Sequence, residues 1–315
     1  MAEHVITRAE PTHRAWDATL APVLEVEPGD VVVAETDDFA GGQVTRDSTA
    51  ADLPELDFDA IYPLAGPIAV RGARAGDALA VEILGFDLPE WGWACIIPGF
   101  GLLPEAEFPE PALRIFDLTG GEHAELTPGV RIPIEPFCGT MGVPGADMRA
   151  TPIPPPHAGG GNIDTRHLTA GTTLYLPVAV DGGLFSLGDA HAAQGDGEVA
   201  ISGLECAMRT RFRIDIVRDA NLPAPQLRRS PGSLTARVDH GGWYGTTGVE
   251  PDLMEAARQS VRAMIDHLGR ERGLSREDAY ILCSLAGDLK ICEVVDTPNW
   301  IVGCFMPDAV FSSGE

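Results

Sequence analysis

The chain has 315 residues, enough for a substantial hydrophobic core in one large domain or two intertwined ones. Its formal net charge of -25 argues against nucleic acid and anionic membrane as partners. The charge is compatible with a neutral or cationic small substrate, or with a metal ion. No run reaches the roughly 18 apolar residues of a membrane span. The first residues, MAEHVITRAE, lack the apolar stretch of a secretory signal, so we expect a cytoplasmic protein.

The first two thirds of the chain read as strands separated by short turns. Residues 23–36, VLEVEPGDVVVAET, alternate apolar and polar positions around the turn PGD. The same construction returns in residues 68–86 with the turn AGD, and in modified form in residues 162–180. Strands joined by short glycine-containing turns predict antiparallel structure, a sandwich or a barrel.

Residues 142–162, GVPGADMRATPIPPPHAGGGN, are rich in proline and glycine. This composition is typical of a surface linker. It is also found in long ordered loops that shape a pocket. The sequence leaves both interpretations open.

The C-terminal part has helical periodicity. Residues 251–268 place apolar side chains at helical spacing, with Pro251 suited to the first helical position and Gly269 to the stop. Ser275 and Asp278 form the pattern of a capping box, and Gly287 suits the end of that second, short helix. Strand character returns in residues 289–307.

The elements together predict an α+β fold dominated by β-structure. A sandwich or barrel-like antiparallel body would span residues 1–230, and a helix–helix–strand portion, packed against it as one intertwined unit, residues 231–315.

Residues 186–205, SLGDAHAAQGDGEVAISGLE, concentrate ligating groups among small residues. If the segment begins as a strand, Asp189 and His191 point to the same face. A carboxylate beside an imidazole suits a divalent metal such as zinc, or a histidine oriented by its carboxylate. The two glycines of QGDGE predict a tight turn that brings Gln194, Asp196 and Glu198 back toward the same place. Glu205 lies on the next expected strand, and a solvated acidic loop is the alternative interpretation.

Two further segments carry candidate groups. In residues 34–45, AETDDFAGGQVT, Glu35 and Asp37 share a face at the end of a strand, as a capped strand end or as part of a site. In residues 132–143, IPIEPFCGTMGV, Glu135 and Cys138 would suit a nitrilase-like amidase with a cysteine nucleophile. That mechanism also needs a lysine, and Lys290 is the only lysine in the chain.

Residues 160–205, GGNIDTRHLTAGTTLYLPVAVDGGLFSLGDAHAAQGDGEVAISGLE, resemble the central motif of the acetamidase/formamidase family. Residues 13–38, 246–268 and 279–300 fit the same family in the same order. The resemblance implies a β-rich fold, commonly oligomeric, that hydrolyses short linear amides to a carboxylic acid and ammonia.

Amides are poor electrophiles, and a metal ion would both polarise the carbonyl and activate water. On this hypothesis Asp189 and His191 are the first metal ligands, with Asp37 or Glu205 as a third. Glu198 or Asp196 acts as general base and then protonates the leaving ammonia. Gln194 or Asn162 would hold the amide or the developing oxyanion, and Asn162, Asp164 and Glu135 are the expected substrate contacts. The rival hypothesis is a non-catalytic β-rich module whose acidic cluster holds calcium, since oxygen-rich turns suit calcium better than zinc.

Overall fold

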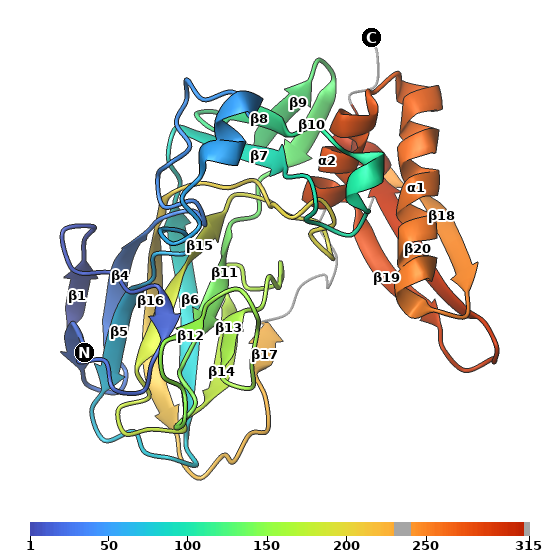
Figure 1. The fold of residues 1–315 in the computed structure, drawn as a ribbon. Helices are drawn as coiled ribbons and strands as arrows, with labels where there is room; N and C mark the ends of the chain where they lie inside the picture. The colour runs from blue at the N-terminus through green and yellow to red at the C-terminus, as the bar shows by residue number, and fades with distance from the viewer. Residues whose placement is uncertain (230–240, 312–315) are drawn as a thin grey trace.

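The computed structural model describes residues 1–229 and 241–311, which form a β-rich body and a smaller C-terminal lobe (Figure 1). The body contains two sheets packed face to face. The first has six strands in the order β1-β4-β16-β6-β14-β17, with the bounds Glu3–Ile6, Val31–Thr36, Met208–Val217, Ala78–Asp87, Thr172–Pro177 and Gln226–Arg229. The second has five strands in the order β13-β11-β15-β5-β3, with the bounds Gly160–Asn162, Phe137–Gly142, Phe185–His191, Ala65–Val70 and Leu24–Val26.

Alternation along the strands explains why these sheets form a sandwich. In β16, Met208, Thr210, Phe212 and Ile214 are buried while the arginines between them point outward. Phe212 meets Phe185 of the opposite sheet edge to face, with ring centroids 5.3 Å apart. The apolar inner faces of both sheets therefore form one core.

The glycine turns recognised in the sequence do not close hairpins. β3 and β4 flank the first turn, β5 and β6 the second, and each pair is divided between the two sheets. β13 and β14, on either side of the third turn, are divided in the same way. The turns are thus crossings from one layer of the sandwich to the other, and strand pairing comes from distant segments.

Most pairings are antiparallel, as expected, but two are parallel: β1 with β4, and β3 with β5. Neither sheet closes into a barrel, so the sandwich is the correct one of the two expected architectures. Short pairs complete the body: β7 (Trp91–Ile96) with β8 (Ala112–Asp117), β9 (His123–Thr127) with β10 (Val130–Pro133), and β2 (Ala15–Trp16) with β12 (Thr151–Pro152). Two 3-10 helices, at Ala50–Glu55 and Glu105–Glu107, lie in the connections.

The C-terminal lobe is a three-stranded sheet, β18-β20-β19, covered by the helices α1 and α2 (Figure 1). The bounds are Trp243–Glu250 for β18, Leu253–Arg272 for α1, Arg276–Ala286 for α2, Asp288–Glu293 for β19 and Trp300–Pro307 for β20. A 3-10 turn at Asp308–Val310 follows β20. The strand β18 is an element that the sequence reading did not include.

The observed ends of α1 and α2 can be compared with the capping residues predicted from the sequence. α2 begins as predicted, because Ser275 accepts a hydrogen bond from the Asp278 backbone N–H at 3.0 Å, and it ends before Gly287. α1 instead takes Asp252 as its N-cap and runs one turn beyond Gly269 to Gly273, whose φ of 66° is left-handed. The expectation of a stop at Gly269 was therefore wrong. The expected boundary between residues 230 and 231 lies outside the described residues.

No helix among residues 1–229 and 241–311 is long and apolar enough to cross a membrane.

Candidate active site

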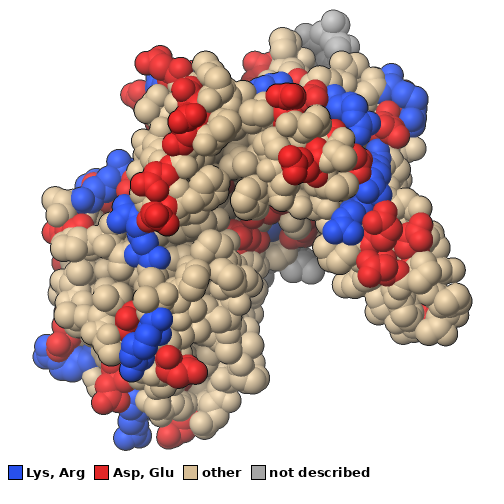
Figure 2. Space-filling view, in the orientation of Figure 1, with Lys and Arg blue, Asp and Glu red and all other residues tan. Residues whose placement is uncertain are grey.

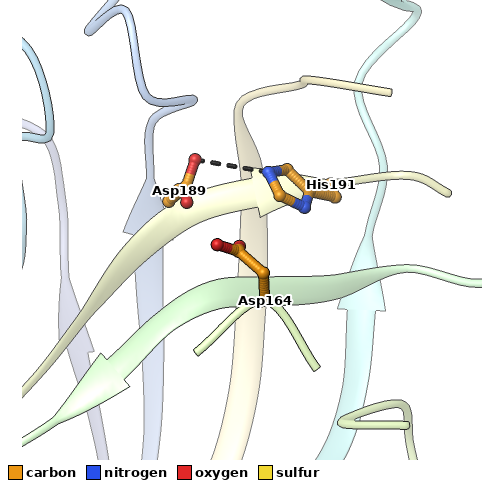
Figure 3. A group of neighbouring side chains, drawn as sticks. All are labelled: Asp164, Asp189 and His191. Atoms are coloured by element: carbon orange, nitrogen blue, oxygen red, sulfur yellow. Dashed lines mark hydrogen bonds and ion pairs between the residues drawn. The ribbon is translucent and has the colours of Figure 1, made fainter. Parts of the chain in front are cut away.

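Strand β15 brings two ligating side chains together inside the sandwich. All seven of its residues are buried. Its last residues place Asp189 Oδ1 3.3 Å from Nε2 of His191, so the two side chains are adjacent as their spacing predicts (Figure 3). Asp189 has a φ of 54°, so the adjacency arises on a backbone that departs from regular strand geometry at this residue.

A third carboxylate comes from the segment after β13. Asp164 points toward Asp189 and His191 from this neighbouring segment of the same chain (Figure 3). The amide of Asn162 donates to Asp164 Oδ2 at 2.8 Å, and Thr140 Oγ1 donates to Asn162 Oδ1 at 2.5 Å. Thr140 Oγ1 also lies 3.4 Å from Asp189 Oδ2. The glycine-rich end of residues 142–162 therefore leads into the site, which supports the pocket-shaping interpretation over a surface linker.

Two more carboxylates come from the turn and the connection after β15. Glu205 Oε1 lies 3.1 Å from His191 Nε2, and Glu198 Oε1 lies 3.8 Å from the same nitrogen. Glu205 is fully buried, and its Oε1 also accepts the Gly203 backbone N–H at 3.0 Å. One ring nitrogen of His191 thus faces Asp189, Glu198 and Glu205.

Left-handed backbone recurs at this site. Asp164, Asp189 and Glu198 have φ values of 38°, 54° and 42°. This conformation costs an L-residue about 1–2 kcal/mol, and such outliers gather at functional sites. Three carboxylates held at this cost in one place indicate a site whose geometry is constrained by function.

Burial dominates the electrostatics of the carboxylates. Burial raises the pKa of Asp164 to about 7, with a further contribution from the charge of Asp189. It raises the pKa of Glu205 to about 8, against the opposing effect of His191, and the pKa of Glu198 well above its usual range. Burial would lower the pKa of His191, but the charges of Glu205 and Asp189 raise it overall. The site therefore attracts protons or another cation.

The cluster occupies space that side chains at two glycine positions would otherwise fill. A Cβ on Gly139 would lie 2.3 Å from Asp164 Oδ1, 2.8 Å from Asp189 Oδ2 and 3.0 Å from His191 Cε1. A Cβ on Gly203 would lie 2.8 Å from the His191 ring. The cluster can form only where the chain has no side chain at these positions.

The donor set fits a divalent cation. Asp164, Asp189 and His191 can present ligand atoms within 4.8 Å of one another, and so can His191, Glu198 and Glu205. Several buried polar atoms of the site have no hydrogen-bond partner in the described part of the chain: Asp164 Oδ1, Glu205 Oε2, His191 Nδ1 and, beside them, Asp38 Oδ1. Unsatisfied buried acceptors are costly, and a bound cation would satisfy them.

The predicted ligand Asp37 does not join this cluster. Its carboxylate pairs with Arg8 at 3.0 Å near the surface. Its neighbour Asp38 is buried instead, accepts the Trp93 indole N–H at 3.1 Å, and has its pKa raised to about 6, first by burial. The chain leaves regular strand geometry after β4, so alternation counted from the strand selects the wrong member of the pair.

Three other predicted residues lie behind the cluster. The Gln194 amide donates to the Asp164 backbone carbonyl at 2.9 Å. Asp196 lies 3.6 Å from Lys290 Nζ and 3.7 Å from His167 Nε2. Glu135 pairs with Arg166 at 3.3 Å. The structure thus brings Asn162, Asp164, Asp189, His191, Glu198 and Glu205 together, and holds Glu135, Gln194 and Asp196 in the adjoining network.

The groups of the nitrilase-like alternative have other partners. The thiol of Cys138 is fully buried, contacts Thr210 Oγ1 at 3.2 Å, and has its pKa raised to about 11 by burial. Lys290 pairs with Asp196 and Asp288. A nucleophilic cysteine needs a lowered pKa, so this environment is unfavourable for that role.

Tyr62 lies near enough to the carboxylates to feel their charge, and sequence reasoning did not connect it with them. Burial raises the pKa of its hydroxyl, and the charges of Asp189, Asp164 and Glu198 raise it further. Its ring contacts that of Phe39, with 5.7 Å between the ring centroids. The tyrosine stands in a loop with a φ of 53°, and no spacing in the sequence connects it with β15.

Comparison with known proteins identifies the family. The model of the acetamidase/formamidase family matches residues 1–151 and 146–313, and the chain belongs to this family. It is 28% identical to a formamidase of Methylophilus methylotrophus, over 95% of this chain and 89% of the relative. It is 25% identical to an acetamidase of Mycolicibacterium smegmatis, over 87% and 85% of the two chains.

Solved structures share the fold. An acetamidase from Bacillus halodurans is 31% identical and superposes with a TM-score of 0.68, with 96% of each chain covered. A gamma lactamase from Delftia acidovorans superposes with a TM-score of 0.90 at 24% identity, with 98% of this chain and 94% of that chain covered.

Proposed function

We propose that the protein is an amidase that hydrolyses a short linear amide, of the formamide or acetamide type, to a carboxylic acid and ammonia. Membership of the acetamidase/formamidase family supports this reaction class, as do relatives named formamidase and acetamidase. The observation that carries the proposal to particular residues is the cluster of buried Asp189, His191 and Glu205 with half-buried Asp164 and Glu198.

A divalent metal ion is part of the proposal. Asp164, Asp189 and His191 would hold it, with Glu205 as the further carboxylate that faces His191. A mixed set of carboxylate oxygens and one imidazole suits zinc, and calcium is the alternative because most of the donors are oxygens. When bound, such an ion polarises the amide carbonyl and lowers the pKa of water.

The other groups of the cluster have distinct proposed roles. Glu198, whose Oε1 lies 3.8 Å from His191 Nε2, accepts a proton from the attacking water and delivers it to the departing ammonia. Asn162, held by Thr140 and Asp164, orients the cluster and offers an amide group to the substrate.

The direct test measures ammonia release from a panel of formamide, acetamide, propionamide and a small lactam, before and after treatment with a chelator. We expect turnover of the shortest linear amides, loss of turnover after chelation, and its return on addition of zinc. Turnover that survives complete removal of divalent ions would refute the metal but leave the amidase.

A non-catalytic calcium module is the second candidate, favoured by the excess of oxygen donors in the cluster. It predicts calcium binding without ammonia release from any amide. His191, which presents Nε2 to three carboxylates, is an uncommon ligand for calcium and favours the amidase.

We propose further that the enzyme is cytoplasmic and forms homo-oligomers. The family resemblance supports an oligomer, and sedimentation of the purified protein tests it.

A further inference from the structure

Two segments of the chain meet at the site, and both carry negative charge. Asp164 follows β13, and Glu198 stands in the turn after β15. The charge of Asp164 raises the pKa of Glu198, second only to burial itself, whereas a side-chain hydrogen bond between the two groups lowers the pKa of Asp164. The two acidic groups repel each other when both are ionised, so contacts outside the cluster help to hold the two segments together.

Arg166 supplies those contacts from behind the site. It stands two residues after Asp164, and only 10% of its side chain is exposed. Its guanidinium group donates to Asp288 of β19 and to Glu135, the latter at 3.3 Å. Burial alone would lower the pKa of Arg166, but the charges of Asp288, Asp196 and Glu135 raise it above its ordinary value. The arginine is therefore a fixed charge in this network.

Asp288 is the point where the two segments join. Its Oδ1, the acceptor for Arg166, also accepts the backbone N–H of Asp196 at 3.1 Å. The next residue, Leu289, donates its N–H to the Asp196 carbonyl at 2.9 Å. One carboxylate of the C-terminal lobe thus binds the Asp164 segment through Arg166 and the Glu198 turn through its main chain.

The packing around this joint is close. Gln194 cross-links the two segments directly through its bond to the Asp164 carbonyl. A Cβ on Gly195 would lie 1.9 Å from the Gly287 carbonyl oxygen, so the turn lies directly against the end of α2. A space of about 10 Å³ remains between Glu135, Arg166 and Gln194, the size of one water molecule.

We infer that Arg166 is a positioning residue of the amidase site. Through its ion pair with Asp288 of the C-terminal lobe, it fixes the position of the Asp164 segment relative to the Glu198 turn. The inference rests on the proposed function. Arg166 does not touch the reacting groups, because Asp288 and Glu135 occupy its guanidinium group. Figure 2 shows the surface hollowed between the body and the lobe, with acidic side chains in the hollow.

The inference assigns a role to residues that the catalytic proposal leaves unused. Glu135 and Asp196 are acidic, as a catalytic group would be, but each is paired with a cation. Lys290, the only lysine of the chain, lies 3.6 Å from Asp196 and 3.5 Å from Asp288 on the outer side of the network. These residues support the joint between body and lobe.

The test compares Arg166→Ala with Arg114→Ala. Arg114 also connects the body to the lobe, through Asp278 at 2.7 Å. Asp278 stands at the start of α2 and, within the described residues, makes no hydrogen bond or ion pair with the Glu198 turn. We expect Arg166→Ala to lower kcat by about 10²-fold with KM changed less than about threefold, since a displacement of about 1 Å can cost that much. Arg114→Ala should lose thermal stability without this loss of kcat.

Chemical rescue separates positioning from general stability. Millimolar guanidinium ion should restore part of the kcat of Arg166→Ala and should leave Arg114→Ala unchanged, and Arg166→Lys should be intermediate. Asp288→Asn should reproduce the kcat loss, and the double variant should be no worse than either single one. If Arg166→Ala does not fold, Asp288→Asn and Arg166→Lys carry the same comparison.

A second measurement is independent of turnover. The shift in melting temperature caused by added zinc should be smaller for Arg166→Ala than for the wild type and for Arg114→Ala. Wild-type protein inactive on every amide would refute the proposed function, while the zinc comparison would still decide the positioning role. Equal zinc shifts in the three proteins, or a kcat for Arg166→Ala within about threefold of wild type, would overturn the inference.

Discussion

The acidic cluster and the network behind it contain the same residue types but differ in how their charges are balanced. In the cluster, Asp164, Glu198 and Glu205 surround one histidine and have raised pKa values. In the network, carboxylates pair with Arg166, Lys290 and His167. Glu198 and Asp196 are two residues apart in one turn, yet they belong to these two different environments.

This difference separates residues that bind a ligand or take part in the reaction from residues that position them. Several buried carboxyl groups that share a single imidazole are unfavourable, and such clusters persist where a ligand or a reaction requires them. A paired carboxylate needs no such explanation. Four predictions test whether the division is correct, in order of decreasing expected effect.

The largest effect is expected for Glu198→Gln. The amide has nearly the same shape as the acid but cannot accept the proton of water, so turnover of the best short amide should fall about 10²–10⁴-fold. The melting temperature should change little or rise, because a crowded acid is removed. Asp196→Asn, in the same turn, is the matched control and should keep turnover within about threefold. Equal losses of turnover in the two variants would show that the cluster and the network do not differ in their role in catalysis.

Gly139→Ala should lower kcat by about 10²-fold. Its new Cβ would displace the carboxylates of Asp164 and Asp189, which it would approach to 2.3 and 2.8 Å. The control is Gly85→Ala on β6, where a Cβ meets nothing within 4 Å. Circular dichroism and steady-state kinetics of both variants make the comparison, and full activity of Gly139→Ala would show that the cluster tolerates rearrangement.

Protein stripped of divalent ions should lose thermal stability as pH rises. The pKa of Asp164 is about 7 and that of Glu205 about 8, both above their unfolded values near 4. Between those limits the folded state binds more protons than the unfolded state, so stability declines from about pH 4 to about pH 8. His191, with its raised pKa, acts in the same direction: its stabilisation is present below about pH 6.5 and is lost as pH rises through the folded value.

Calorimetry across this pH range, with and without zinc, checks the expectation. Added zinc should raise the melting temperature by several degrees at pH 8 and by less at pH 5, because the ligands bind the ion only when deprotonated. A metal-free protein whose stability is flat from pH 5 to pH 8 would contradict the clustered arrangement.

The smallest effect is expected for Cys138→Ala. The thiol is buried and its pKa is about 11, so its loss should leave turnover within about threefold and cost about 1 kcal/mol of stability. Labelling of the native protein with iodoacetamide should likewise leave Cys138 unmodified. Complete loss of activity in a well-folded variant would restore the cysteine mechanism.

Local patterns in the sequence were enough for several features of this protein. Alternation predicted the strands that flank the turns PGD and AGD, the capping box predicted the start of α2, and two-residue spacing predicted that Asp189 lies beside His191. The central motif of residues 160–205 was sufficient to predict the family. Each of these depends on contacts between residues close in the chain, or on a pattern that is complete within one segment.

Only the tertiary structure decided which acids belong to the site. Asp38 rather than Asp37 is buried, and Glu198 rather than Asp196 faces His191, because left-handed residues and loops break the alternation that assigns faces. The turns cross between sheets, and Arg166 and Lys290 reach carboxylates that are distant in sequence. Whether a charge is compensated depends on partners more than a hundred residues away, such as Arg166 and Asp288, and no local pattern contains that information.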